Sequence, residues 1–173
     1  MSNNVYSANQ RRASADEDFY RGWADYKYGF GSLHGNFWLG LEKVHQMTYK
    51  RRYELRIDMV FQDASYYASY KKFALFGEAE NYMIRLSGYS GNAADNLSGH
   101  NRVPFTTKDR DNDLYSKNCA VEFVGAWWYG KCHASNLNGQ WGNKNYAKGP
   151  TWSSLTTQYD HVTFSEMKIR PID

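Results

Sequence analysis

The stretch from about residue 87 to about residue 160 constrains the fold most, because it shows neither a helical nor a strand period. Gly, Asn, Ser and Asp are dense in it, and its apolar residues come in bursts such as Ala126-Trp127-Trp128-Tyr129. A long irregular segment in a compact domain is usually functional or disordered, and two adjacent tryptophans that need burial argue against disorder. Something must replace the missing ladder hydrogen bonds. A bound cation together with a disulfide would do so.

A run of carboxylates inside this stretch is the best candidate for a cation site. Asp109, Asp111 and Asp113 stand at alternate positions, and Ca²⁺ takes six to eight oxygen ligands from carboxylates, carbonyls and water. The run fails the EF-hand pattern, since its sixth position is Leu114 rather than Gly and its twelfth is Ala120 rather than Glu. From the residues alone, a calcium site of another design and a polar turn rich in Asp and Asn are equally open.

The two cysteines, Cys119 and Cys132, follow the run closely. A bridge between them would stabilise the fold by about 3 kcal/mol, and the alternative is two buried thiols of the kind common in cytosolic proteins. Such a pair cannot bind zinc by itself, and the CxxC spacing of a redox motif is absent. Asn96-Leu97-Ser98 is a glycosylation sequon, which matters only if the chain is secreted.

Composition and charge exclude several classes of protein. The chain has 173 residues, enough for one domain with a real core, and its 17% aromatic content predicts a core built from aromatic rings. The net charge is only +3, with Lys and Arg scattered along the sequence, so no patch for nucleic acid is expected. No apolar run approaches a membrane span, and no signal-peptide core is visible. The chain is then either cytosolic or the mature portion of a secreted protein, and the cysteines favour secretion.

Local patterns predict an α+β fold, with a mostly antiparallel sheet flanked by short helices. Residues 1–13 are expected to form a flexible arm, and residues 14–173 a single domain. Helices are predicted over about 16–28 and 37–45, from the spacing of aromatic residues and a capping-box pattern at Ser14. Strands are predicted over 53–59, 66–76, 82–86 and 165–172, from alternating apolar and polar residues.

Together these motifs resemble the fibrinogen C-terminal (fibrinogen-related) domain, the module of ficolins, tachylectins and angiopoietins. The matching stretches run in order from about residue 10 to the end of the chain. They are Asp18-Phe19-Tyr20-Arg21-Gly22-Trp23-Ala24-Asp25-Tyr26, Gly35-Asn36-Phe37-Trp38-Leu39-Gly40, Tyr53-Glu54-Leu55-Arg56, Thr107-Lys108-Asp109-Arg110-Asp111-Asn112-Asp113, Asn118-Cys119-Ala120, Ala126-Trp127-Trp128-Tyr129, Cys132-His133, Ser135-Asn136-Leu137-Asn138-Gly139 and Glu166-Met167-Lys168-Ile169-Arg170-Pro171. The family's N-terminal subdomain, with its own cysteine pair, has no counterpart in this sequence.

The resemblance implies how the domain is organised. It implies a central sheet subdomain over about 14–105 that the C-terminal strand 163–172 rejoins, and a loop-rich calcium- and ligand-binding subdomain over about 106–160. The family's calcium ligands fall on the carboxylates of Asp111 and Asp113. They also fall on two backbone carbonyls, those of Tyr115 and Lys117. Asp109 lies outside this ligand set, and the resemblance implies a disulfide between Cys119 and Cys132.

The resemblance also implies a ligand pocket beside the calcium loop. In acetyl-binding members a cis peptide, here Lys131–Cys132, turns the N–H groups of Cys132 and His133 toward the acetyl carbonyl. The implied wall residues are Phe123, Trp128, Tyr146 and Ala147. The function implied is calcium-dependent, lectin-like recognition of acetylated sugars on microbial surfaces, in innate immunity, by a secreted homo-oligomer that is not an enzyme.

Three substitutions relative to the family's acetyl binders bear on the choice of ligand. Phe123 replaces a common Tyr, while Lys131 and Lys148 replace a common Asn and Asp, so the rim is more basic and would favour anionic acetylated ligands. A fibrin-type pocket for a cationic peptide N-terminus is disfavoured, because its acidic positions are Phe123 and Ala147 here. A secreted receptor-binding ligand of the angiopoietin type, with purely structural calcium, is the open alternative.

Overall fold

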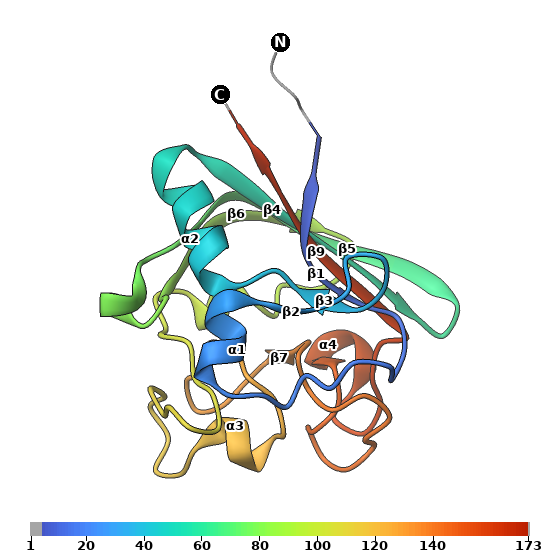
Figure 1. The fold of residues 1–173 in the computed structure, drawn as a ribbon. Helices are drawn as coiled ribbons and strands as arrows, with labels where there is room; N and C mark the ends of the chain where they lie inside the picture. The colour runs from blue at the N-terminus through green and yellow to red at the C-terminus, as the bar shows by residue number, and fades with distance from the viewer. Residues whose placement is uncertain (1–4, 173) are drawn as a thin grey trace.

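A computed structural model describes residues 5–172 of the chain. It shows an α+β domain in which one twisted, antiparallel sheet crosses the upper part of Figure 1, with short helices and long loops below and beside it. The sheet has the strand order β2-β3-β1-β9-β4-β5-β6. The fold class predicted from the sequence is confirmed.

The sheet strands are mostly long and pair in antiparallel register. They are β1 (Ser7–Arg12), β2 (Phe30–Gly31), β3 (Phe37–Trp38), β4 (Tyr53–Phe61), β5 (Ala64–Leu75), β6 (Ile84–Gly91) and β9 (Phe164–Pro171). The period of two predicted for β4 is confirmed, since Leu55, Ile57 and Met59 are buried and the residues between them are not. Positive φ angles at Gln62 and Asp63 form the tight turn that joins β4 to β5.

The N-terminal segment corrects the prediction of a flexible arm. Within residues 1–13, Ser7–Arg12 form β1, which pairs with both β9 and β3 in the middle of the sheet. The first four residues lie outside the described part of the chain. The arm prediction failed because β1 turns polar side chains inward: the buried Arg12 guanidinium donates to the carbonyls of Leu137 and Gly139, far along the chain.

The helices are shorter than predicted or are displaced. The helix predicted over 16–28 is only α1 (Trp23–Tyr28), because residues 16–22 form local turns, with the Asp18 carboxylate accepting from Tyr20 N. The element predicted over 37–45 is strand β3 followed by α2 (Leu41–Lys50), and the two are separated by Gly40, whose φ is +118°.

The segment between β6 and β9 is irregular, as its sequence predicts, and yet it is well packed. It contains α3 (Cys119–Glu122), α4 (Ser153–Thr156), the 3₁₀ turn at Ser98–His100 and a small sheet of β7 (Ser135–Asn136) and β8 (Thr151–Trp152). Trp127, Trp128 and Trp152 are fully buried in it. In Figure 1 the segment lies below the main sheet, with α3 at the foot of the molecule.

Candidate functional site

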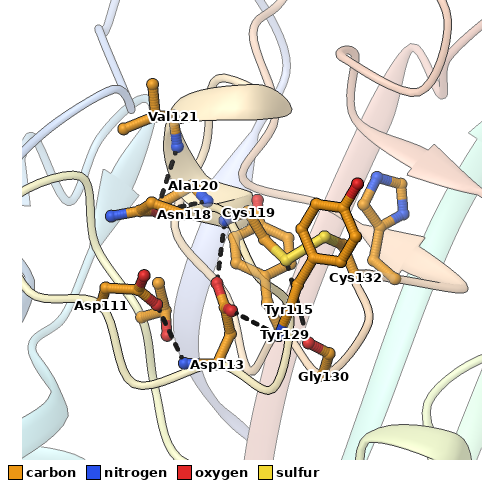
Figure 2. Close-up of a disulfide and its surroundings, with 12 residues drawn as sticks. Asp111, Asp113, Tyr115, Asn118, Cys119, Ala120, Val121, Tyr129, Gly130 and Cys132 are labelled. Atoms are coloured by element: carbon orange, nitrogen blue, oxygen red, sulfur yellow. Dashed lines mark hydrogen bonds between the residues drawn. A yellow bond between two sulfur atoms is a disulfide. The ribbon is translucent and has the colours of Figure 1, made fainter.

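The disulfide and α3 form one wall of the predicted site. Cys119 and Cys132 are bonded, with 2.01 Å between the sulfur atoms, which confirms the pairing. Asn118 caps α3, since its side-chain oxygen accepts from the backbone N–H groups of Ala120 and Val121 (Figure 2). Its amide nitrogen donates to the carbonyls of Thr107 and Lys108. Asn118 therefore joins the start of the carboxylate run to α3.

Asp109, Arg110 and Asn112 attach the carboxylate run to the rest of the domain. Asp109 accepts from Trp23 N at the start of α1 (2.9 Å) and from the Thr107 hydroxyl (2.7 Å). Although partial burial opposes the change, these hydrogen bonds hold the pKa of Asp109 below its ordinary value. The Arg110 guanidinium lies 4.2 Å from the Trp23 ring centre, and Asn112 donates to the Phe105 carbonyl. Asp109 thus has a structural role, outside the ligand set.

The other two carboxylates, those of Asp111 and Asp113, face the inside of the loop (Figure 2). Asp113 accepts from the backbone N–H groups of Tyr115 (2.9 Å) and Cys119 (2.8 Å), while Asp111 accepts from Asp113 N (3.2 Å). Burial, followed by the negative charge of Asp111, raises the pKa of Asp113 despite these bonds. Among residues 5–172, no Lys or Arg pairs with either carboxylate.

The donor set of this loop fits a hard cation that binds oxygen. Within the described chain, the backbone carbonyls of Tyr115 and Lys117 accept no hydrogen bond, so both are uncommitted. No group of three or more His, Cys, Asp or Glu side chains in the described residues could hold a metal. A cation here would therefore rely on two carboxylates, carbonyl oxygens and water, the ligands that Ca²⁺ accepts.

The loop is joined directly to the segment that contains the predicted acetyl-binding amides. Leu114 N donates to the Gly130 carbonyl (3.0 Å), Gly130 N donates to the Cys132 carbonyl (2.9 Å), and the disulfide links Cys132 back to α3. On the other side, His100 accepts from Ala134 N (3.1 Å). These bonds connect the loop to residues 130–134.

The backbone at residues 131–133 has the conformation that the resemblance implies. The Lys131–Cys132 peptide bond is cis, although residue 132 is not proline. Within residues 5–172, neither Cys132 N–H nor His133 N–H has a hydrogen-bond acceptor. Two adjacent free donors are thus present beside the disulfide, and a carbonyl oxygen is the kind of group that could bind both.

Phe123, His133 and Ala147 lie together next to these donors. The rings of Phe123 and His133 are 4.9 Å apart, edge to face, and His133 Nε2 is 3.0 Å from the Ala147 carbonyl. Because a carbonyl only accepts, Nε2 carries the proton. Burial lowers the pKa of His133 to about 4, so the ring is neutral at neutral pH. The group offers an apolar wall without a buried charge.

The remaining predicted residues occupy different environments. Trp128 corrects the prediction: its side chain is buried in the core against Trp38 and Phe105, and its indole N–H donates to the Tyr82 carbonyl. Tyr146 is 54% exposed and packs edge to face on Tyr159, so its ring lies at the surface. Lys131 is also exposed.

Two asparagines, Asn118 and Asn96, also bear on the site and on its modification. Asn118 was not predicted as a site residue, although Asn directly before a short helix is a recognisable capping signal. Asn96, the acceptor of the sequon, is 9% exposed, and its side-chain nitrogen donates to the Ser154 hydroxyl (3.0 Å). Glycan attachment at Asn96 would require this folded segment to open.

The family is decided by comparison of the whole sequence. The model of the family described as fibrinogen beta and gamma chains, C-terminal globular domain, matches residues 1–172. The chain belongs to this fibrinogen family. Its relatives include tenascin-R from Rattus norvegicus, 46% identical over 162 residues, which are 94% of this chain and 12% of the relative. The chain thus spans a small part of that relative's length.

Solved structures of fibrinogen-like domains show the same fold. The fibrinogen-like globe domain of human ANGPTL2 matches with a TM-score of 0.93 and 39% identity, covering 96% of this chain and 80% of that one. Lamprey fibrin D-dimer, complexed with the peptide ligand Gly-His-Arg-Pro-amide, matches with a TM-score of 0.92 and 31% identity, covering 99% and 63%. Family membership supports a fibrinogen-like ligand-binding function. Family members are generally not enzymes, and the relatives are extracellular or cell-surface proteins.

Among the described residues, no helix combines the length and apolar character needed to cross a membrane.

Proposed function

We propose that this domain recognises acetylated groups, above all acetylated sugars on microbial surfaces, in a calcium-dependent manner and without chemical turnover. The observation that carries the proposal is the pair of free backbone N–H groups at Cys132 and His133, beside the apolar wall of Phe123 and His133. The two donors would bind the acetyl carbonyl oxygen, and the wall would contact the methyl group.

Bound Ca²⁺ would neutralise the facing carboxylates of Asp111 and Asp113. The chain's own bonds then connect the loop to the binding segment, through Leu114 N and the Gly130 carbonyl and through the disulfide. Calcium would thus act by ordering residues 130–133. The ligand itself would contact only backbone donors and the apolar wall.

The chemistry of the wall favours a neutral acetyl group over a cationic peptide terminus. Phe123 and Ala147 carry no charge, and His133 is neutral because burial lowers its pKa to about 4. An ammonium group would therefore lose its hydration without gaining a carboxylate partner. Lys131 at the rim is exposed, and it would favour acetylated ligands that also carry a negative charge.

A single site of this size should bind weakly, because the contact involves only a few heavy atoms of the ligand. Useful affinity would then come from several copies of the domain that act together on one particle. We propose that the secreted protein is a homo-oligomer for this reason and that it works in innate immunity.

The test is retention on an acetylated resin with and without a chelator. We expect retention in calcium, and release by free N-acetylglucosamine or by chelator. Asp111→Ala should not be retained, whereas Asp63→Asn, which removes an exposed negative charge from the distant β4–β5 turn and tolerates its positive φ, should behave as the parent protein. Retention of Asp111→Ala, or retention in excess chelator, would contradict the coupling between calcium and ligand.

A second candidate is a secreted receptor-binding ligand of the angiopoietin type, in which calcium is purely structural. It is favoured by the exposed side chains of Leu114 and Val121, which are 67% and 52% accessible near the loop. Exposed apolar groups of this kind suit contact with another protein. No retention on any acetylated resin, together with calcium-dependent stability, would favour this candidate.

A further inference from the structure

A second hollow, of about 590 Å³, lies away from the predicted calcium and acetyl site. It opens between the C-terminal end of α2 and the strands β4, β5 and β6. Figure 1 shows α2 and α3 well apart, at the upper and lower parts of the molecule. Its volume is in the range of sites that hold small ligands. None of the residues predicted for calcium or acetyl binding lines it.

The lining of this hollow, here called the basic cleft, is strongly cationic. Among residues 5–172, six cationic residues line it and no Asp or Glu does so. They are Lys50, Arg51, Arg52, Lys72, Arg85 and Arg102. Because the whole chain carries a net charge of only +3, the remainder of the molecule is net acidic. A cleft lined by one sign of charge focuses the electrostatic field and attracts ions of the opposite sign.

The expectation that Lys and Arg are scattered is therefore wrong for the folded chain, in which several of them lie together. Lys50, Arg51 and Arg52 form a run of three at the end of α2, and the fold brings Lys72, Arg85 and Arg102 next to it from β5, β6 and the following loop. These last three residues are far from the run in sequence, so no local pattern reveals the cluster.

Five of the six cations of the cleft have no anionic partner among the described residues. Lys50, Arg52, Lys72, Arg85 and Arg102 make no ion pair and no side-chain hydrogen bond among residues 5–172. Arg51 makes an interaction of its own and is left out of this set.

Cations elsewhere on the same sheet are paired instead. Lys168 lies 2.8 Å from Asp58, and Arg170 lies 2.5 Å from Glu54. Five unpaired cations that converge on one cleft repel one another, and a bound anion would relieve that repulsion.

The shape and the floor of the cleft suit a ligand larger than a single ion. Phe73 and Leu86 are buried beneath it, and the Tyr49 ring beside it is 80% exposed. A neighbouring hollow of about 270 Å³ shares Arg85 and Arg102 and so extends the cleft. Guanidinium groups bind tetrahedral oxyanions through paired hydrogen bonds, and an exposed tyrosine ring offers a face to a sugar.

We propose that the basic cleft binds a ligand that carries two or more sulfate or phosphate groups. The site is independent of the acetyl-binding proposal, since it shares no residue with it. The sulfate could come from a sulfated sugar chain and the phosphate from a polyphosphorylated small molecule. The two sources present the same oxyanion chemistry to the same guanidinium and ammonium groups.

The test is isothermal titration of the whole chain at about 0.15 M salt, with two probes in separate arms. One probe is a heparin-derived hexasaccharide, and the other is inositol hexakisphosphate. We expect at least one to bind, and the stronger binder identifies the source. Removal of the sulfates from the hexasaccharide should abolish binding in that arm. Absence of binding in both arms, or equal binding of the desulfated sugar where the hexasaccharide is the ligand, would overturn the proposal.

The chain offers matched control variants. Lys50→Gln/Lys72→Gln removes two charges from the cleft, whereas Lys43→Gln/Lys71→Gln removes two lysines from the same helix and strand that do not line it. Since loss of one exposed ion pair weakens binding by about 1.4- to fivefold, the cleft pair should weaken binding by about two- to thirtyfold, and clearly more than the control pair does. Equal losses would show a response to net charge alone and would overturn the proposal.

A second variant guards against an indirect effect of folding. Arg85→Gln/Arg102→Gln should weaken binding at least as much and should reduce the slope of affinity against salt concentration by about one for each lost contact. Thermal unfolding should be nearly unchanged, because both side chains are exposed and neither makes an ion pair or a side-chain hydrogen bond among residues 5–172. An unchanged affinity in a folded variant would refute the assignment of the cleft.

Discussion

Asp109 and Asp111 lie two positions apart in the sequence, and yet their removal should have opposite consequences. Asp109 accepts hydrogen bonds from Trp23 N and the Thr107 hydroxyl. Among residues 5–172, Asp111 accepts from Asp113 N alone, and it faces a second carboxylate. Asp109→Ala should therefore destabilise the domain when no calcium is present. Asp111→Ala should have little effect on stability, or a favourable one, under the same conditions.

The magnitudes follow from the contacts. The bond from Trp23 N caps α1 from outside the helix, and loss of such a cap costs about 1 kcal/mol. The bond from Thr107 adds about 1 kcal/mol. Asp109→Ala should thus lower the free energy of unfolding by about 2 kcal/mol, or the melting temperature by about 4–8 °C. Asp111→Ala removes a charge repulsion of at most about 1 kcal/mol at a solvent-exposed position.

Calcium should close most or all of the stability gap between the two variants. At a concentration about 100-fold above its dissociation constant, a ligand stabilises a folded protein by about 2.7 kcal/mol. The parent protein and Asp109→Ala should both gain this increment, while Asp111→Ala should gain almost none because it lacks a ligand oxygen.

The assay is thermal unfolding of the three proteins, by circular dichroism, with excess chelator and across a calcium titration. Full calcium stabilisation of Asp111→Ala would refute the ligand assignment. An Asp109→Ala variant as stable as the parent in chelator would refute the structural role given to Asp109.

Three further predictions concern the framework of the site. Burial lowers the pKa of His133 to about 4, below an ordinary value of about 6.5, so the unfolded chain binds more protons between these pH values. The contribution of neutral His133 to the free energy of unfolding is complete above about pH 6.5 and should fall by up to about 3 kcal/mol toward pH 4. Denaturant titrations should show a smaller fall in the His133→Gln variant. An identical pH profile in the two proteins would contradict the assignment. The double variant Cys119→Ser/Cys132→Ser opens a loop whose ends are 13 residues apart. It should lower the free energy of unfolding by about 2–4 kcal/mol, measured by urea unfolding. No loss would mean that other contacts hold the loop. Asn118→Ala removes the cap of α3 and the two bonds to Thr107 and Lys108, directly before the carboxylate run. It should cost about 1–2 kcal/mol and weaken calcium binding in a calorimetric titration, and unchanged values of both would disprove its bridging role.

Local sequence patterns predicted the elements in which the local preference for helix or strand matches the burial that the tertiary fold imposes. The alternation in β4 is visible because Leu55, Ile57 and Met59 all turn to the core. The helix predicted over 16–28 failed because Phe19, Trp23 and Tyr26 are all buried at helical spacing, although Phe19 comes from a turn. Helical spacing of aromatic residues indicates that they are buried on one side. Here an irregular segment, rather than a helix, buries the first of them.

Long-range contacts account for the rest. β1 was missed because its buried polar side chains are satisfied by carbonyls near residues 137–139, which no window of sequence contains. The disulfide and the cis peptide at residues 131–132 were implied by the resemblance to a family, whereas the residues alone left two buried thiols as an alternative. Trp128 shows the limit of such transfer, since its ring lies in the core rather than at the binding wall.

The central claim is that the amides of Cys132 and His133 bind an acetyl carbonyl when calcium orders the neighbouring loop. The most direct measurement is an amide ¹H–¹⁵N correlation spectrum, recorded while N-acetylglucosamine is titrated in calcium and again in chelator. The account predicts that the largest shifts in calcium occur at the amides of Cys132 and His133, and that both resonances stay unchanged in chelator. Ligand-induced shifts elsewhere with these two amides unmoved, or identical shifts in chelator, would contradict it.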